Sequence, residues 1–251
     1  MALHTAAYHV AHRLARRRSA PALHPQGLTC GGTLEVPGSP DRRWGAGWLD
    51  RPGSYEVTVR WSRALGLPGR LPDGLGLALR VPDAGGPGAA LDLLLTSSRP
   101  GRLGRHLPLL RRDALAGPYS SLLSYRAGDR ERVVAAFPVR GAHGRVPGGL
   151  PALRQALERE PVRFHLCTAA ADEPWRAVAT LTIGPPGPAP EHSTVSYDPY
   201  VHRLPDFHPT ARLSRLRAAA YSGSRRGRAA PDPDGDGGVT GEPGRDQQAT
   251  P

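Results

Sequence analysis

The strongest constraint on the fold of this chain is a strict alternation of apolar and polar side chains in residues 54–62, SYEVTVRWS. The apolar positions are Tyr55, Val57, Val59 and Trp61. Since successive side chains of a β-strand point to opposite faces, this period of two predicts a strand with one face buried against a core. Arg60 and Ser62, two positions apart, then share the opposite face of the strand.

Further apolar segments, separated by turn residues, predict more strands. Residues 75–81 and 91–97 flank the glycine- and proline-rich segment 82–90, so we expect them to form a hairpin. The other predicted strands cover residues 27–36, 162–169 and 175–183. Short strands with turns between them favour an antiparallel barrel or sandwich over alternating parallel strands and helices.

Apolar residues at helical spacing predict helices between these strands. The predicted helices cover residues 2–18, 103–116, 119–126, 150–159 and about 210–224. The proline-rich segment 184–190 is interpreted as a linker inside the domain. We therefore expect an N-terminal arm over residues 1–19, one domain over residues 20–228 and a disordered tail over residues 229–251.

All 33 basic residues are arginine, since the sequence contains no lysine, and the formal net charge is +11. The tail holds five acids and one arginine, a charge of −4, which leaves +15 for residues 1–228. The arginines are scattered, and no helix-turn-helix, zinc-finger or aromatic RNA-binding pattern accompanies them. We therefore expect no nucleic-acid partner.

The cysteine count indicates a reducing compartment. Cys30 and Cys167 are the only two, too few for a disulfide framework or a cysteine-based zinc site. No run approaches the roughly 18 apolar residues of a membrane helix, and the N-terminus shows no apolar core of a secretory signal. The expected location is the cytoplasm, with no membrane span.

Four short patterns with chemically active residues follow one another along the chain. They are His24-Pro25-Gln26-Gly27, Val59-Arg60-Trp61-Ser62, Asp92-Leu93-Leu94-Leu95-Thr96 and Arg217-Ala218-Ala219-Ala220-Tyr221, the last followed by Arg225, Arg226 and Arg228. The interval from His24 to Arg60 is 36 residues, as is that from Arg60 to Thr96. This ordered set resembles the haem catalases, especially their small catalase-like relatives (catalase-related peroxidases) that lack the C-terminal helical domain.

The resemblance implies an α+β fold, a closed antiparallel β-barrel of the catalase type with flanking helices, and haem b as the cofactor. It implies that Tyr221 is the axial ligand of the haem iron and that His24 is the acid–base above the haem. It assigns Arg60 and Arg228 to the haem propionates, and it places Thr96 where the family has an asparagine.

Elementary chemistry is consistent with these implied roles. A tyrosine with an ordinary pKa near 10 stays protonated at neutral pH, and Arg217, one helical turn before Tyr221, would favour the phenolate. A histidine with a pKa near neutrality suits proton transfer between the two oxygens of a peroxide. Ser62 is expected to orient the ring of His24 by a hydrogen bond.

The chain also departs from the family pattern. Thr96 offers a hydroxyl in place of an amide, and Pro21 stands near the position of a family arginine. The interval from Thr96 to Tyr221 is much shorter than in a full-length catalase, which leaves no room for the family's nicotinamide site. The barrel and haem pocket of the family can therefore persist in this chain without fast dismutation of hydrogen peroxide.

We therefore expect a haem-dependent oxidoreductase whose substrate is hydrogen peroxide or an organic hydroperoxide, either a weak catalase or a peroxidase. Two alternatives stay open, a non-catalytic haem-binding protein and a haem-free protein of the same fold, and so does a homo-oligomeric assembly. A Ser-His-Asp hydrolase is not supported, because no Gly-x-Ser-x-Gly occurs. His4, His9 and His12 lack the spacing of metal ligands on a helix.

Overall fold

The computed structural model describes residues 26–39, 41–68, 70–139, 141, 143–187 and 196–210. The predicted N-terminal arm, the predicted last helix beyond Thr210 and the predicted tail lie outside these residues. Four predicted site residues lie outside them as well: His24, Arg217, Tyr221 and Arg228.

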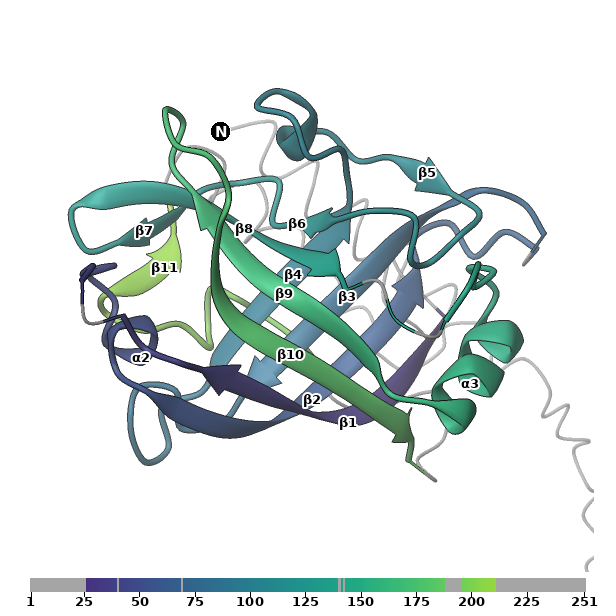
Figure 1. Cartoon of the computed structure of the whole chain (residues 1–251), viewed down its shortest axis with the longest axis horizontal. Helices are drawn as coiled ribbons and strands as arrows, with labels where there is room; N and C mark the ends of the chain where they lie inside the picture. Colours follow the sequence, from purple (N-terminus) through teal and green to yellow (C-terminus); the bar gives the residue numbers. More distant parts are fainter. Residues whose placement is uncertain are drawn as a thin grey trace, which may run out of the picture.

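Eight of the described strands close into an antiparallel barrel (Figure 1). They are β1 (Gln26–Val36), β2 (Gly53–Arg63), β3 (Asp73–Val81), β4 (Leu91–Ser97), β6 (Tyr119–Ser120), β8 (Arg130–Pro138), β9 (Val162–Ala169) and β10 (Arg176–Pro186). Around the barrel the order is β8-β6-β4-β3-β2-β1-β10-β9, and β9 pairs with β8 to complete the circle. The predicted antiparallel barrel and the predicted hairpin of β3 and β4 are both confirmed.

Shorter elements lie outside this circle. They are α2 (Gly47–Asp50), the 3-10 helix η1 (Gly104–His106), β5 (Leu110–Arg111), β7 (Tyr125–Ala127), α3 (Leu150–Arg159) and β11 (Phe207–Pro209). β5 pairs with the start of β3, and β7 pairs with both β8 and β11. None of the helices in the described ranges is long and apolar enough to cross a membrane.

The barrel interior is filled by the apolar side chains that the alternation predicted. On β2, Val57, Val59 and Trp61 are at most 4% exposed. Trp61, Tyr119 and Phe164 come from β2, β6 and β9, which are not neighbours in the sheet, yet their ring centroids lie 5.7–6.0 Å apart. Rings from such strands meet through the middle of the barrel, so this face of each strand points inward.

The helix predicted over residues 150–159 is α3, with the predicted bounds. Leu153 and Leu157 lie on one face and are buried, and Leu150 packs beside them. Pro151 stands in the first turn, where a missing backbone N–H costs no helical hydrogen bond. The helix lies against β10 and β1 and covers that end of the barrel wall (Figure 1).

The helices predicted over residues 103–116 and 119–126 are wrong. This part of the chain forms η1, β5, β6 and β7, joined by loops. Helical spacing of leucines is a helix signal only where the leucines face a core, and here they face solvent while Arg105 is buried. Pro108 in addition lacks the N–H that a helix interior needs. The exposed leucines are Leu103, Leu107 and Leu110.

Two further strands of the barrel differ from the sequence prediction. Residues 130–138 form β8, which was not predicted because the segment lacks alternating apolar and polar residues. Its buried residues follow one another directly: Val133, Val134, Ala135 and Ala136. A strand covered on both faces reads as a continuous apolar run. β10 continues to Pro186, into the segment interpreted as a linker.

Leu79 offers a test of the inward assignment, because it is fully buried in β3 between Val59 of β2 and Leu93 of β4. Leu79→Ala should lower the free energy of unfolding by about 2–5 kcal/mol, since it leaves a cavity in a close-packed core. Leu103→Ala, at an 83% exposed side chain, is the control and should change it by less than about 0.5 kcal/mol. Urea denaturation measures both, and equal effects would contradict the assignment.

Candidate functional site

The outer face of β2, β3 and β4 carries the polar side chains that alternate with the core. Ser62 pairs with Gly76, and Gly76 pairs with Thr96. Directly paired residues in antiparallel strands point to the same face. Ser62 and Thr96 therefore lie on one line across the outside of the barrel, and Arg60, which pairs with Ala78, lies on the adjacent line of the same face.

Gly27 of the first sequence pattern belongs to the same face, since it pairs with Ser62. The guanidinium of Arg60 lies directly over it. A Cβ at Gly27 would stand 2.6 Å from Arg60 Cζ and 2.8 Å from the carbonyl oxygen of Trp61, closer than real side chains approach. The glycine thus makes room for a guanidinium that is buried against β1, with Arg60 only 9% exposed.

The structure therefore brings three of the four sequence patterns together, through Gly27, through Arg60 with Ser62, and through Thr96. Ser62 is buried, and its hydroxyl donates to the carbonyl of Gly76 at 3.4 Å. Thr96 is half-buried. The fourth pattern lies wholly outside the described residues, as does His24 of the first.

An ion pair between half-buried Arg80 and buried Asp92 on this face holds the chain between Ser196 and His202 against β3 and β4. Asp92 is fully buried, and its two oxygens accept hydrogen bonds from Arg80 at 2.8 and 2.7 Å. Asp92 also accepts the backbone N–H of Asp198 at 2.7 Å and lies 3.0 Å from Nδ1 of His202. Arg80 in turn donates to the carbonyl of Ser196 at 2.9 Å. Charge-assisted bonds of this kind are strong, so the segment is firmly anchored.

Sequence reasoning missed the role of this pair, although the sequence holds a signal for it. Arg80 and Asp92 stand at matching positions on either side of the predicted hairpin turn, and the register pairs them directly. Opposite charges facing each other across two strands stabilise the pairing. A search of the hairpin for such cross-strand charges would have found them.

Tyr197 lies beside the ion pair and has a hydroxyl without a hydrogen-bond partner among the described residues. The guanidinium of Arg80 stands 5.3 Å from the centre of its ring. Burial raises the pKa of Tyr197 to about 12, against the opposing effect of Arg80, so the phenol stays protonated at neutral pH. The hydroxyl of Thr29, opposite Arg60 in the sheet, is likewise buried and without a described partner.

The chemistry of these donors fits the carboxylates of the haem expected from the sequence. Arg60 supplies a buried positive charge, and Tyr197 and Thr29 supply two unpartnered hydroxyls. Gly76 and Ala78, the β3 residues paired with Ser62 and Arg60, have small side chains or none, so a flat ring could approach the backbone of this face. No group of three His, Cys, Asp or Glu side chains within the described ranges could hold a metal ion, and Tyr221, the expected ligand, lies outside them.

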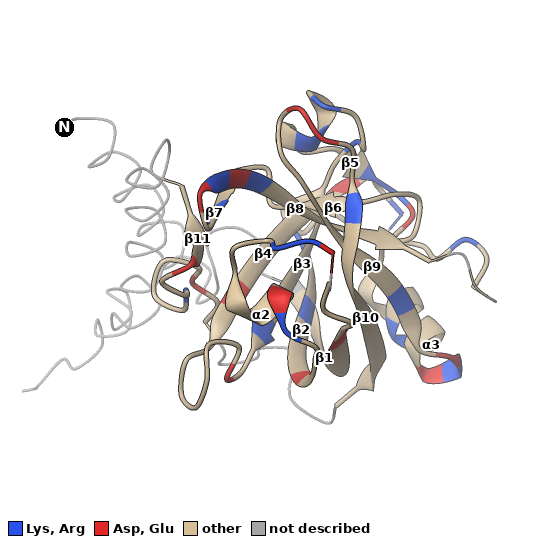
Figure 2. Cartoon of the chain, turned by 60° about the vertical axis from the view of Figure 1, so that its left-hand side comes forward, with Lys and Arg blue, Asp and Glu red and all other residues tan. Residues whose placement is uncertain are grey.

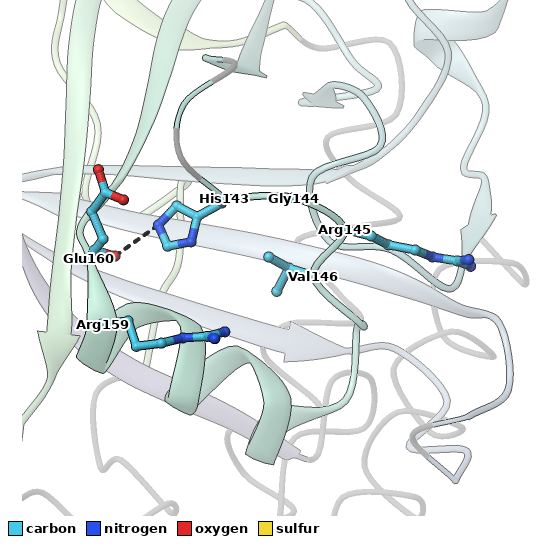
Figure 3. Close-up of a pocket in the computed structure, with 6 residues that line it drawn as sticks. All are labelled: His143, Gly144, Arg145, Val146, Arg159 and Glu160. Atoms are coloured by element: carbon cyan, nitrogen blue, oxygen red, sulfur yellow. Dashed lines mark hydrogen bonds between the residues drawn. The ribbon is translucent and has the colours of Figure 1, made fainter.

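A surface hollow of about 220 Å³ lies elsewhere, between residues 143–146 and the end of α3 (Figure 3). Nε2 of His143 lies 2.9 Å from the carbonyl oxygen of Glu160, and Arg145 and Arg159 also line the hollow. None of the site residues expected from the sequence lines this hollow. We therefore do not place the candidate site there.

Neither a scan against models of protein families nor a search of curated proteins matches the sequence. The fold, in contrast, matches solved structures of catalases. Catalase A from Saccharomyces cerevisiae matches with a TM-score of 0.61 at 12% identity, over 82% of this chain and 60% of that one. A fungal catalase gives 0.59 at 13% identity, over 84% and 60% of the two chains. A bacterial catalase gives 0.58 at 12% identity, over 82% and 56%.

These matches confirm the predicted barrel of the catalase type. At such identities the likeness concerns the fold alone. The chain spans 56–60% of the length of the catalases it matches.

The hydroxyl of Tyr197 predicts an uncommon response to its removal. Tyr197→Phe in the haem-free protein should leave the free energy of unfolding unchanged or raise it by about 1 kcal/mol, because no hydrogen bond is lost. Tyr119→Phe is the matched change, since that hydroxyl donates to the carbonyl of Ala114 at 2.7 Å and accepts from Trp61 Nε1 at 3.2 Å. It should cost about 1–3 kcal/mol in urea denaturation. Equal losses in the two variants would contradict the assignment.

Alkaline pH tests the same hydroxyl. The pKa of Tyr197 rises from about 10 in the unfolded chain to about 12 in the fold, so the folded state holds this proton more tightly. The stability that the shift contributes is complete below about pH 10 and is lost as the pH rises from about 10 to 12. Tyr197→Phe should remove part of this alkaline loss from the pH profile of unfolding.

Proposed function

We propose that this protein binds haem b on the outer face of β1–β4 and uses it to react with peroxides, as a weak catalase or as a peroxidase for organic hydroperoxides. One observation carries the proposal: Arg60, Ser62 and Thr96 share one face of a catalase-type barrel, in register with Gly27. A shift of a single residue in one strand would send that strand's residues to the opposite face. Their coincidence on one face therefore supports a common site.

Bound haem would supply an iron centre that exchanges electrons with the peroxide as the O–O bond breaks. The guanidinium of Arg60, buried over Gly27, would pair with a propionate carboxylate and fix the ring in position. Arg228 would hold a propionate in the same way. Tyr221 would ligate the iron through its phenolate oxygen, and Arg217 one helical turn earlier would keep that oxygen deprotonated.

His24 would act on the peroxide side of the ring, taking a proton from one peroxide oxygen and delivering it to the other. Ser62 would orient it. Because the Ser62 hydroxyl already donates its hydrogen to the carbonyl of Gly76, its oxygen would serve as the acceptor for an imidazole N–H. This leaves the other ring nitrogen of His24 for the proton transfer.

The cysteines do not offer an alternative peroxide chemistry. Cys30 and Cys167 are both free and buried, and burial raises the pKa of each thiol to about 11. Peroxide reacts with thiolates rather than thiols, so these two side chains are poor peroxide reductants. Free thiols of this kind also support the cytoplasm as the place of action.

Thr96 supports a second candidate function, a haem-binding protein without catalysis. Its hydroxyl has a single hydrogen to donate and a shorter reach than the amide that the catalase family carries at the matching position. A peroxide would be held less firmly there. Hydrogen peroxide turnover would then be slow or absent while haem binding persists.

The ligand assignment is tested by the absorption spectrum of the protein supplied with haem. Tyr221→Phe should remove the Soret band or shift it to that of another ligation type, because the phenolate oxygen is lost. Tyr55→Phe, at a half-buried tyrosine of β2, is the control and should leave the spectrum as it is. An unchanged spectrum for Tyr221→Phe would rule out this ligand.

The enzyme proposal is tested by the rate of peroxide consumption. His24→Ala should lower turnover by about 10²- to 10⁴-fold, the usual contribution of a positioned acid–base group, while the haem content stays the same. His165→Ala, at an exposed histidine of β9, serves as control.

Thr96→Asn in the same assay separates the two candidate functions, because it restores the amide and should raise turnover of hydrogen peroxide. If haem binds but neither His24→Ala nor Thr96→Asn changes peroxide consumption, the protein is a haem-binding protein and the enzyme proposal fails.

A further inference from the structure

The exposed apolar side chains are gathered on two segments of the chain. Seven large apolar side chains are exposed in the described part of the protein, and six are leucines of the β2–β3 loop (residues 64–72) and the η1 segment (residues 98–112). Such a concentration marks an interaction surface. The leucines are Leu65 (50%), Leu67 (36%), Leu71 (40%), Leu103 (83%), Leu107 (62%) and Leu110 (57%).

The two segments meet at one end of the barrel, where β5 lies beside the start of β3 (Figure 1). Leu110 of β5 pairs with Gly74. The carbonyl of Gly74 in turn accepts the backbone N–H of Ala64 at 2.7 Å, at the start of the β2–β3 loop. Gly74 thus contacts both segments, so the end of the η1 segment and the start of the β2–β3 loop are neighbours in the fold.

The β2–β3 loop is built around a buried ion pair instead of an apolar core. Arg63 and Asp73 are 2% and 0% exposed, with Nε and Oδ2 3.5 Å apart. Asp73 accepts the backbone N–H groups of Leu65 and Leu67 at 2.9 and 3.1 Å. Arg63 donates to the carbonyl of Leu71 at 3.1 Å. The loop backbone is held from inside by charged groups, and the leucine side chains are left on the outside.

The η1 segment shows the same arrangement, with buried arginines and exposed leucines. Arg105 is 2% exposed, donates to the carbonyl of Ala170 at 3.3 Å and lies 5.1 Å from the ring centre of Trp175. Arg111 is buried and donates to the carbonyl of Gly117 at 2.6 Å. Arg105 and Arg111 are therefore buried, while Leu103, Leu107 and Leu110 between and beside them are exposed. On a surface that contacts only water, leucines are usually buried and arginines exposed.

The exposed charges of this surface are all positive. Neither segment contains an acidic residue. Its exposed arginines are Arg70, Arg99, Arg102 and Arg112. Basic stretches of chain lie beside β5 in Figure 2. The nearby acids Asp172 and Glu173, on the turn that Arg102 contacts, are themselves bonded by Arg130 and Arg132.

We propose that the β2–β3 loop and the η1 segment form a docking surface for a bilayer that contains anionic phospholipids. Leucine side chains would enter the interfacial layer, and the arginines would pair with lipid phosphates, so apolar burial and electrostatic attraction would both contribute to binding. A second copy of the chain fits less well, because a two-fold contact would oppose two faces of the same positive charge. The proposal does not depend on haem binding.

Flotation of the full-length protein with vesicles is the primary test. Vesicles of phosphatidylcholine alone are compared with vesicles of phosphatidylcholine and phosphatidylserine in equal amounts. Binding should be at least about ten-fold stronger to the anionic vesicles and should weaken with salt. Because the net charge of +11 attracts any anionic surface, variants must show which residues are responsible.

The apolar contribution is tested by Leu103→Ser combined with Leu107→Ser, which should weaken binding to the anionic vesicles by about ten-fold. Both side chains are exposed, so the melting temperature should not change. Val201→Ser is the matched control, because Val201 is 61% exposed but lies outside the proposed surface. It should retain the binding of the unmodified protein.

The charge contribution is tested by Arg70→Gln combined with Arg112→Gln, which should weaken binding by about ten-fold or more. Arg126→Gln combined with Arg163→Gln removes the same charge from exposed positions on β7 and β9 and is the control.

Loss of binding in both surface variants, with retention in both controls, supports the proposal. Three results overturn it. One is the absence of vesicle binding, and another is an equal loss from the two arginine pairs, which would show attraction by net charge alone. The third is a dimer in sedimentation velocity that the leucine variant dissociates, which would show that a second copy covers the surface.

Discussion

The face that each strand turns outward depends on the packing of the barrel interior, where three aromatic rings meet. Trp61, Tyr119 and Phe164 meet at one place from β2, β6 and β9, and the hydroxyl of Tyr119 joins Trp61 to the carbonyl of Ala114. Because a slip by one residue would exchange the two faces of a strand, this interior fixes the register. Arg60 is on the outside because Trp61, its neighbour in the chain, is held on the inside.

The sequence predicts the fold where one face of an element is buried and the other is not. Residues 54–62 and 150–159 show the periods of a strand and a helix, and both elements form where expected. Residues 130–138 are buried on both faces and carry no period, so β8 went unpredicted. For residues 103–116 the predicted helix is wrong, because the prediction assumed that the periodic leucines are buried. In the structure these leucines are exposed, and Arg105 is buried.

The candidate site was predicted in part, for a related reason. Sequence patterns with fixed spacing named Arg60, Ser62 and Thr96, and strand register brings these onto one face. The ion pair of Arg80 and Asp92 follows no sequence motif of fixed spacing, because the two side chains face each other only once β3 and β4 are paired in register. Contacts made by register are visible in a sequence only once the pairing of the strands is known. The roles proposed for these residues remain predictions.

The barrel wall is not equally strong around its circumference. β6 has two residues and pairs through two positions with β4 and two with β8, whereas β1 and β2 pair along 11 positions. β6 is held instead by its side chains, since the Tyr119 ring contacts Trp61 and Phe164 and the Ser120 hydroxyl donates to the carbonyl of Arg105 at 2.6 Å. Thr96 pairs with Ser120 of this short strand, while Arg60 lies on the longest ladder. The two ends of the outer face are therefore fixed by different means, a backbone ladder at Arg60 and side-chain packing at Thr96, so a change in the core packing around Tyr119 would move the Thr96 end and leave the Arg60 end in place.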